Sequence, residues 1–202
     1  MYPRYLKRLI DLSLTVPGFL LISPLFLILA LLIKLDDGGP IFFTQRRLGY
    51  KMKPFKIIKF RTMVVGADKM GPAVTSGDDK RITRIGRFLR KYKLDELPQL
   101  INVIKGDMSL VGPRPEVEKY AKYYQKDFEE ILNCTRPGIT DYATIEFRNE
   151  EEILARYSDK ERAYIEEILP KKLELNKKYC NDIGFLTDLK IIFKTLWRIV
   201  KK

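Results

Sequence analysis

The feature that most constrains this chain is a long apolar run near its N-terminus. Residues 12–33 carry no charged side chain and are mostly aliphatic or aromatic. As a straight helix, a run of about 22 residues would extend about 33 Å, enough to cross the hydrocarbon core of a bilayer. No small-residue cleavage site ends the run, so we do not expect a removable signal peptide. The run predicts a membrane helix, with a buried helix of a soluble core as the alternative.

Prolines complicate a simple membrane crossing. Pro17 and Pro24 both fall inside the run. Pro24 lacks an N–H donor and its ring clashes with the carbonyl four residues earlier, so we expect a kink near the middle of the helix. The Ser23 hydroxyl can satisfy a carbonyl that the kink leaves free. A kinked helix that crosses the bilayer and one that re-enters on the same face both fit.

Basic residues flank the run on both sides. They are Arg4, Lys7 and Arg8 before it and Arg46, Arg47, Lys51 and Lys53 after it. Basic flanks favour the cytoplasmic side of a membrane. A re-entrant hairpin places both flanks on that side, whereas a single span places only one there.

The composition limits the chemistry that is available. Lys+Arg of 38 against Asp+Glu of 26 gives a formal charge of +12, which favours nucleic acid, phosphorylated molecules or a phospholipid surface as partners. The chain has no histidine, so imidazole cannot act as a general base or a zinc ligand. Cys134 and Cys180 lie far apart without a CxxC motif, which indicates a reduced compartment and argues against a metal site.

Beyond the apolar run, the chain alternates between short strands and helices. Segments 41–44 and 55–60 are rich in β-branched and aromatic residues, which predicts a β-hairpin. Segment 81–92 has apolar residues at helical spacing, with arginine at every third position. Segment 150–178 is highly charged and predicts surface helices. We therefore expect a single, mostly helical α+β domain with a small β-hairpin.

Two adjacent carboxylates, Asp95 and Glu96, follow the basic segment. Asp95 is a good N-cap for a helix that ends at Gly106, and Glu96 would complement the helix dipole without doing chemistry. Alternatively, the arginines and free amides nearby attract phosphates, and the two carboxylates attract a divalent cation. Neighbouring helical side chains point about 100° apart, so one carboxylate could attack while the other holds metal. The pattern alone leaves both interpretations open.

Several motifs occur in a fixed order along the chain. They are F-x-Q-x-R-x-G at 43–49, KFRTM at 59–63, LDELPQL at 94–100, NVIKGDMS at 102–109, GPRP at 112–115, RPGIT at 136–140 and DLK at 188–190. Together they closely resemble the bacterial sugar transferases, which are small monotopic phosphoglycosyl transferases. The resemblance covers nearly the whole chain, and a chance match of so many ordered motifs is implausible.

The resemblance implies an activity. It is the transfer of a sugar 1-phosphate from a UDP-sugar to undecaprenyl (polyprenyl) phosphate at the cytoplasmic face of the bacterial inner membrane, with release of UMP. In that family the aspartate of the dyad, here Asp95, is the nucleophile and forms a covalent phosphosugar intermediate. The glutamate, here Glu96, helps to hold Mg2+ at the dyad. A carboxylate needs no partner base to act as a nucleophile, which suits a chain without histidine.

The resemblance also implies a set of cations. Lys59, Arg90 and Arg114 fall where the family has positive charge around the phosphates, and they would offset charge on the transferring phosphoryl group. Arg136 lies in the matching RPGIT motif, and Arg148 is retained in the segment that follows it; both are further candidates for binding substrate or phosphate.

Two proline positions have implied structural roles. Pro115 resembles a position that is often cis in the family, which would aim the preceding arginine into the site. Ser23 and Pro24 match a break in the family's membrane helix, which favours a re-entrant helix. We therefore expect a membrane-associated segment over 1–36 and a cytoplasmic catalytic domain over 37–202.

One segment departs from the family pattern. Many members continue after RPGIT with Gly, an aromatic residue or Leu, and then AQVNGR, whereas this chain has DYATIEFRNE at 141–150. Arg148 and Asn149 remain, but Glu146 and Phe147 replace an Asn-Gly turn. If this segment contacts the sugar or the uridine, the identity of the sugar cannot be transferred from better-known members.

The last segment, 187–202, predicts a second contact with the membrane. Its apolar face consists of Leu189, Ile192, Phe193, Leu196, Trp197 and Val200, and its basic face of Lys190, Lys194, Arg198 and Lys201. An amphipathic helix lying in the membrane interface fits this pattern, with core packing as the alternative.

Two other classes of protein explain part of the sequence. A membrane-tethered scaffold or binding protein would account for the apolar run and the charge, but not for the carboxylate dyad. A nucleic-acid-binding protein would account for the basic segment, but no recognised motif of that class occurs and we expect no nucleic acid partner.

Overall fold

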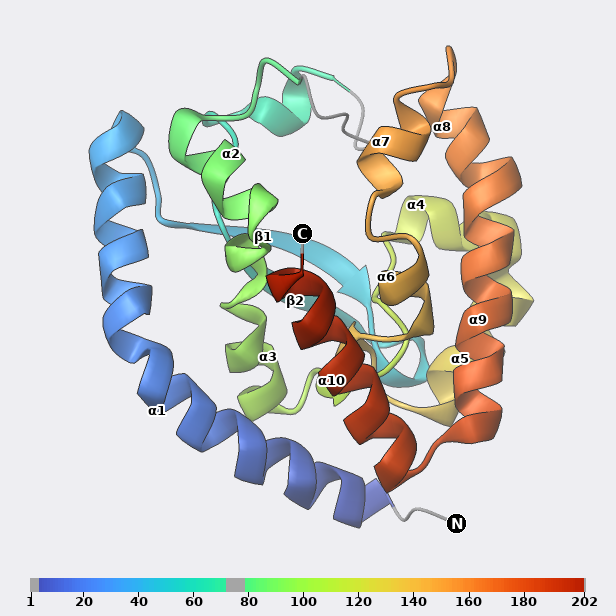
Figure 1. Ribbon diagram of the computed structural model, residues 1–202. Helices are drawn as coiled ribbons and strands as arrows, with labels where there is room; N and C mark the ends of the chain where they lie inside the picture. The colour runs from blue at the N-terminus through green and yellow to red at the C-terminus, as the bar shows by residue number, and fades with distance from the viewer. Residues whose placement is uncertain (1–3, 72–78, 202) are drawn as a thin grey trace.

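The computed structural model describes residues 4–71 and 79–201. The helices are α1 (Arg4–Asp37), α2 (Arg84–Lys91), α3 (Gln99–Lys105), α4 (Glu118–Ala121), α5 (Gln125–Cys134), α6 (Tyr142–Glu146), α7 (Glu150–Leu154), α8 (Lys160–Ala163), α9 (Leu169–Asp182) and α10 (Phe185–Val200). The strands are β1 (Phe42–Leu48), β2 (Pro54–Phe60), β3 (Ser109–Val111) and β4 (Gly138–Thr140). This arrangement is the expected α+β domain, and Figure 1 shows its helices around the small β-hairpin.

Helix α1 is continuous although Pro17 and Pro24 lie inside it. The Ser23 hydroxyl donates a hydrogen bond of 2.8 Å to the carbonyl of Leu20, which is the carbonyl that Pro24 leaves without its helical partner. Figure 1 shows that α1 bends near its middle, so that its first half runs beneath the domain and its second half along the side. The expected kink and the expected role of Ser23 are both confirmed.

Most of α1 is exposed. It is long and apolar enough to cross a membrane, with a mean hydropathy of 2.6 in a window of which only 11% is buried. Such exposure does not fit the alternative of a buried helix in a soluble core. Whether the helix crosses the bilayer or re-enters it stays a prediction.

The two halves of α1 are held to the domain by different forces. In the first half, Lys7 pairs with Asp188 of α10 at 2.6 Å, and Arg8 donates to the carbonyl of Val103 at the end of α3 at 2.5 Å. In the second half, Phe26 packs on Phe60 of β2 with ring centroids 4.6 Å apart. Polar contacts therefore hold the first half of the helix, and the second half is held by apolar packing together with an ion pair between Asp37 and Arg61.

The predicted hairpin is confirmed as an antiparallel pair of β1 and β2, in which Phe43 lies opposite Lys59. Asn102 of α3 ties this hairpin to the helix that follows the carboxylate dyad. Its Oδ1 accepts from the backbone N–H of Ile58 at 2.9 Å, and its Nδ2 donates to the carbonyl of Lys56 at 2.8 Å. One side chain thereby replaces a neighbouring strand at this edge of β2.

A second, parallel pair of strands, β3 and β4, was not predicted from the sequence. Each strand has three residues, which is too short for an alternating pattern to be recognised. The backbone segments at Gly112 and Gly138 approach each other closely just beyond β3. A Cβ atom on Gly138 would lie 2.1 Å from the backbone nitrogen of Gly112. Glycine at these positions lets the segment before Arg114 pack directly on β4.

The largest core cluster contains residues that we expected at the surface. Segment 150–178 folds into α7, α8, a π-helical turn at 164–168 and most of α9. Its buried members in that cluster are Leu154, Ala163, Tyr164, Ile168, Leu169 and Leu173. The expectation of a solvated helix pair is wrong, because charged residues cover only the outer face of these helices.

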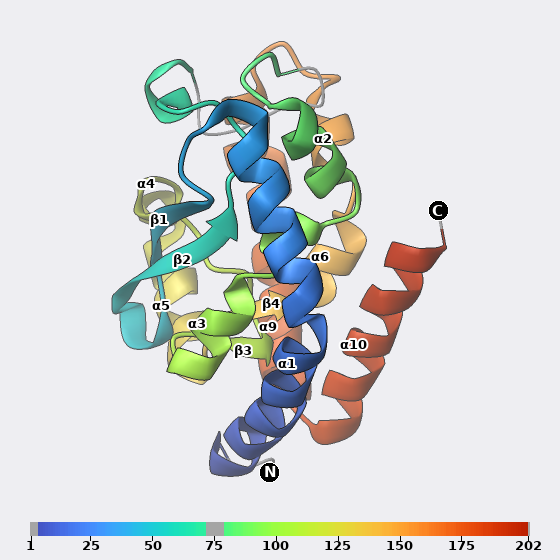
Figure 2. The same ribbon diagram turned by 90° about the vertical axis from the view of Figure 1, so that its left-hand side faces the viewer.

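Helix α10 lies at the edge of the molecule, as Figure 2 shows from the side, and most of its apolar face is uncovered. Leu189, Phe193, Leu196 and Trp197 are exposed, whereas Asp188 and Ile191 face the core. Core packing therefore does not explain the apolar face, which fits the expected interfacial helix. Lys202 lies outside the described residues.

Replacing Asn102 with leucine should destabilise the fold. It would leave the N–H of Ile58 and the carbonyl of Lys56 without partners, and each unsatisfied buried group costs about 1–3 kcal/mol. We expect the free energy of unfolding, measured by urea titration in detergent, to fall by about 2–4 kcal/mol. The exposed Asn133 provides the control, since Asn133→Leu should change it by less than about 0.5 kcal/mol. Equal stability of the two variants would contradict this role for Asn102.

Labelling of single cysteines tests the topology of α1. In a Cys134→Ser, Cys180→Ser background, Tyr5→Cys reports the start of α1 and Lys53→Cys reports the exposed turn of the hairpin. A re-entrant helix predicts that a membrane-impermeant maleimide labels both positions from the cytoplasmic face. Labelling of the two positions from opposite faces would instead show that α1 crosses the membrane.

Candidate active site

Asp95 lies in a tight turn between two helices. Lys93 adopts a left-handed conformation (φ 57°) after α2, residues 94–96 form a single 3₁₀ turn, and α3 begins only at Gln99. The expectation that Asp95 caps a helix is therefore wrong, because the left-handed Lys93 and the turn displace the helix start past Pro98. Asp95 is 8% exposed, and its Oδ1 atom is buried without a hydrogen-bond partner.

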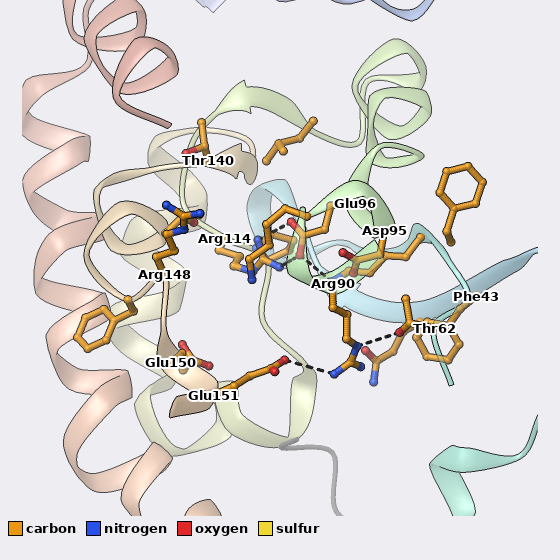
Figure 3. Close-up of a pocket in the computed structure, with 18 of the residues that line it drawn as sticks. Phe43, Thr62, Arg90, Asp95, Glu96, Arg114, Thr140, Arg148, Glu150 and Glu151 are labelled. Carbon is orange, nitrogen blue, oxygen red and sulfur yellow. Dashed lines mark hydrogen bonds and ion pairs between the residues drawn. The ribbon is translucent and has the colours of Figure 1, made fainter. Parts of the chain in front are cut away.

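Glu96, in contrast to Asp95, has a carboxylate that is bound by two cations. Arg114 Nη1 donates to Oε2 at 3.0 Å and Nη2 donates to Oε1, while Lys59 Nζ contacts Oε1 at 3.0 Å. Such a bidentate arginine pair fixes both position and orientation. Figure 3 shows this cluster beside the free carboxylate of Asp95.

The two carboxyl groups have pKa values shifted in opposite directions. Burial raises the pKa of Asp95, the negative charge of Glu96 raises it further, and Lys59 opposes both. Burial would also raise the pKa of Glu96, but Arg114 and Lys59 outweigh it and hold that pKa well below its usual range. Glu96 is therefore the permanently charged member of the pair.

Arg114 is oriented by its neighbours and not by an unusual peptide bond. No cis peptide bond occurs in residues 4–71 and 79–201, so the expectation of a cis bond before Pro115 is wrong. The trans form is intrinsically preferred by about 0.5–1 kcal/mol, and the turn needs no exception. Instead, the backbone N–H of Arg114 donates to Asp141 Oδ2 at 3.2 Å and its side chain donates to Glu96.

Arg90 approaches the same site from α2. That helix begins at Arg84 with Thr83 as its N-cap, later than the predicted start at residue 81. Arg90 Nε donates to Thr62 Oγ1 at 3.0 Å, and Nη1 pairs with Glu151 of α7 at 3.3 Å. In Figure 3 this pair lies below the dyad, with Arg148 and Glu150 on the α6–α7 side.

These side chains line one large cavity of about 1780 Å³. Seven of the predicted site residues line it. They are Lys59, Arg90, Asp95, Glu96, Arg114, Pro115 and Arg148. A pocket for one drug-sized ligand is about 300–1,000 Å³, so two substrates fit here. Leu14 of α1, Leu100 of α3 and Leu196 of α10 add an apolar wall.

Arg136 is not brought to this cavity. Its Nε atom donates to the carbonyl of Gly106 at 2.9 Å, and its guanidinium lies 5.6 Å from the ring centre of Tyr50. The first contact places it at the C-terminal end of α3, where a cation complements the helix dipole, and the second places it against the connection between β1 and β2. The geometry therefore gives Arg136 a structural role and does not support a direct contact with phosphate.

The carboxylates fit a Mg2+ ion that has few protein ligands. Within the described ranges, no group of three or more His, Cys, Asp or Glu side chains could hold a metal. Mg2+ is commonly held by one or two carboxylates together with substrate phosphates. Asp95 Oδ1 has no partner, and Glu96 Oε2 accepts a hydrogen bond from Arg114 and keeps acceptor capacity.

Sequence reasoning missed several residues that build the site. Asp141 holds the backbone of Arg114 and caps α6, accepting from the N–H of Thr144 at 2.6 Å. Thr62 and Glu151 fix Arg90. Thr62 lies in the KFRTM motif and could have been suspected, whereas no local pattern marks Asp141 or Glu151.

The fold and the site together define a class of protein. A free buried carboxylate lies among cations in a cavity flanked by two helices with exposed apolar faces. This combination suits a membrane-associated protein that acts on phosphorylated ligands.

Comparison with known proteins gives the family. The model of the bacterial sugar transferases matches residues 2–202, so the chain belongs to that family. It is 38% identical over 199 residues to the UDP-glucose:undecaprenyl-phosphate glucose-1-phosphate transferase of Escherichia coli (strain K12). It is 35% identical over 198 residues to the UDP-N-acetylgalactosamine-undecaprenyl-phosphate N-acetylgalactosaminephosphotransferase of Aeromonas hydrophila.

A shorter relative is similar over most of its own length. The chain is 37% identical over 205 residues to the exopolysaccharide production protein ExoY of Sinorhizobium fredii, covering 94% of this chain and 83% of that protein. The E. coli and Aeromonas matches cover 96% and 97% of this chain but 40% and 44% of those proteins. The chain therefore spans less than half the length of these two relatives.

Replacing Arg114 with lysine should weaken phosphate binding. Lysine cannot form the bidentate arrangement, so we expect the affinity for inorganic diphosphate with Mg2+ to fall about tenfold by calorimetry, which is about 1.4 kcal/mol. Arg136→Lys is the matched control outside the cavity and should stay within about twofold of wild type. A loss in Arg136→Lys as large as that in Arg114→Lys would contradict this assignment of the two arginines.

Proposed function

We propose that this protein transfers a sugar 1-phosphate from a UDP-sugar to undecaprenyl (polyprenyl) phosphate through a covalent intermediate on Asp95, and releases UMP. The observation that carries the proposal is the buried Asp95 carboxylate, whose Oδ1 has no partner although Lys59, Arg90 and Arg114 line the same cavity. The names of the Escherichia and Aeromonas relatives describe transfers of this kind.

In the first step, Asp95 attacks the phosphorus that carries the sugar. A bond forms between a carboxylate oxygen and this phosphorus, and the bond to the bridging oxygen of the diphosphate breaks, so that UMP leaves. Lys59, Arg114 and Arg90 offset the negative charge on the phosphoryl oxygens. Burial of Asp95 removes water that would otherwise solvate the nucleophile and hydrolyse the acyl phosphate.

In the second step, a phosphate oxygen of the polyprenyl phosphate attacks the same phosphorus. The bond to Asp95 breaks, the carboxylate is regenerated, and a polyprenyl diphosphate sugar forms. The lipid acceptor suits a cavity wall made by Leu14 and Leu196, which come from α1 and α10. The exposed apolar faces of these two helices would place the cavity at the level of the lipid headgroups.

The proposal includes Mg2+ as cofactor. Asp95 and Glu96 would hold the ion together with the diphosphate of the donor. When bound, the ion neutralises charge on the diphosphate and polarises the bond to the leaving group. Lys59 and Arg114 keep Glu96 ionised, and thus available as a ligand, over the working range of pH.

The proposed location is the cytoplasmic face of the bacterial inner membrane, as a monotopic protein with a re-entrant α1. Donor and acceptor would meet there in the first membrane step of glycoconjugate synthesis. The name of the ExoY relative places that protein in exopolysaccharide production.

A non-catalytic scaffold is the competing function, and release of UMP distinguishes the two. The purified protein is incubated with Mg2+, undecaprenyl phosphate and a panel of UDP-sugars. With at least one donor, an enzyme of this kind releases UMP over many turnovers when the acceptor is supplied, and at most one UMP per protein molecule when the acceptor is left out. No release with any donor would favour the scaffold.

Replacing Asp95 with asparagine should abolish turnover and leave the fold intact. The amide has the same shape, and the Oδ1 position makes no hydrogen bond that the change could break. We expect UMP release to fall by at least about 10³-fold, because an amide cannot form the acyl phosphate. The circular dichroism spectrum and the thermal midpoint should match those of wild type.

The matched control is Asp182→Asn, on the exposed surface of α9. Its turnover should equal that of wild type. Turnover of Asp95→Asn near the wild-type rate would refute the assignment of Asp95 as nucleophile.

A further inference from the structure

Several buried polar atoms that line the cavity have no hydrogen-bond partner among the described residues, and the side-chain carbonyl of Asn176 is one that has no role in the steps above. Asn176 of α9 is 5% exposed, lines the cavity, and its Oδ1 atom is buried without a hydrogen bond. A buried amide carbonyl without a donor is unfavourable unless a ligand or an ordered water supplies the donor. Its position inside a substrate-sized cavity favours a ligand.

The surroundings of Asn176 form a polar wall. Lys172 lies one turn earlier on the same face of α9, lines the cavity, and pairs with Glu150 of α7. Arg148 lines the cavity from the α6–α7 segment, and its guanidinium has no partner among the described residues. Figure 3 shows Arg148 and Glu150 on the side of the cavity away from Asp95.

This wall is linked to the phosphate-binding arginine through the backbone. Asp141 accepts from the N–H of Arg114 and caps α6 through the N–H of Thr144. Helix α6 in turn packs on α9, where the rings of Tyr142 and Tyr179 meet edge to face at 6.2 Å. A donor whose diphosphate lies at Arg114 therefore has the α6–α9 wall within reach of its remaining parts.

The other wall is unsuited to the polar ends of the donor. Leu14 of α1, Leu100 of α3 and Leu196 of α10 line it, and α1 and α10 have exposed apolar faces. The acceptor's hydrocarbon chain matches that side. The hydroxyls and N–H groups of a nucleotide sugar then fit the α6–α9 side.

We propose that Asn176 binds the part of the donor outside its diphosphate, accepting a hydrogen bond from an N–H or O–H group. This inference rests on the proposed function and names a residue that selects the donor. Two parts of the donor carry such groups. Uracil presents an N–H between two carbonyls, which pairs with both atoms of an amide, and the sugar presents hydroxyl or N-acyl groups.

The test replaces Asn176 with leucine, which has the same branched shape, is somewhat larger and has no hydrogen-bonding atom. The affinity for UMP is measured by calorimetry, which needs no turnover, and the KM for the UDP-sugar is measured by UMP release. We expect the KM to rise about tenfold, the effect of losing one hydrogen bond and leaving the ligand group unpaired. Asn181→Leu, on the exposed side of the same helix, should change neither quantity.

The two measurements identify the group that Asn176 binds. If it is uracil, the affinity for UMP falls about tenfold together with the rise in KM. If it is the sugar, KM rises and the affinity for UMP stays at the wild-type value. A purely structural role would lower the thermal midpoint with both affinities unchanged, and that result overturns the proposal.

A second variant guards against misfolding. Asn176→Ser removes the carbonyl but leaves space and a hydroxyl for water, so it should fold even if the leucine variant does not, and it should show the same rise in KM. Wild-type values in Asn176→Ser would overturn the proposal.

The absence of UMP release from wild-type protein would instead refute the proposed function. The UMP titration would still report whether Asn176 binds the nucleotide.

Discussion

Glu96 accepts hydrogen bonds from Arg114 and Lys59, and the rest of the site depends on this contact. It engages both cations, while the Oδ1 atom of the adjacent Asp95 is buried without a hydrogen-bond partner. It also joins β2, the dyad turn and the loop after β3 at one point. Two neighbouring carboxylates thus acquire different roles because only one of them has cationic partners.

The same logic extends to the scaffold around the dyad. Asn102 fixes α3 to the edge of β2, and Asp141 fixes the backbone of Arg114. Helix α1 is tied to this assembly by Lys7, which pairs with Asp188 of α10 in a buried position. Figures 1 and 2 show α1 and α10 diverging from this pair, with the domain between and behind them. A membrane-associated helix is thereby connected to α10, whose Leu196 lines the cavity, so that membrane insertion and site geometry are expected to depend on each other.

Strong local patterns in the sequence were enough to predict some elements. The apolar run, the β1–β2 hairpin and the kink at Pro24 each follow from composition or from one residue's covalent geometry. The family resemblance named Lys59, Arg90, Arg114, Arg136 and Arg148 as site residues, and all of them except Arg136 line one cavity. The predicted end of α3 at Gly106 also holds, since this glycine takes up the left-handed conformation at the helix C-terminus.

Features that depend on tertiary contacts could not be predicted. The three-residue strands β3 and β4 are stable only because each pairs with the other, and Arg136 is directed to the end of α3 by neighbours far away in sequence. The sequence around Asp95 predicts a helix cap, and no local pattern indicates the left-handed backbone conformation of Lys93 that excludes one. Asn176 sits in a charged helix with no motif around it, and only its burial beside the cavity distinguishes it.

The central claim is that Asp95 becomes covalently attached to the phosphosugar, and intact-mass measurement tests it most directly. Wild-type protein is mixed with Mg2+ and a productive UDP-sugar, without acceptor, and quenched in acid. The account predicts a mass increase equal to one sugar phosphate, located by peptide mapping on Asp95 and removed when undecaprenyl phosphate is added. Turnover by a protein that shows no such adduct at any quench time, or an adduct of equal yield in Asp95→Asn, would contradict it.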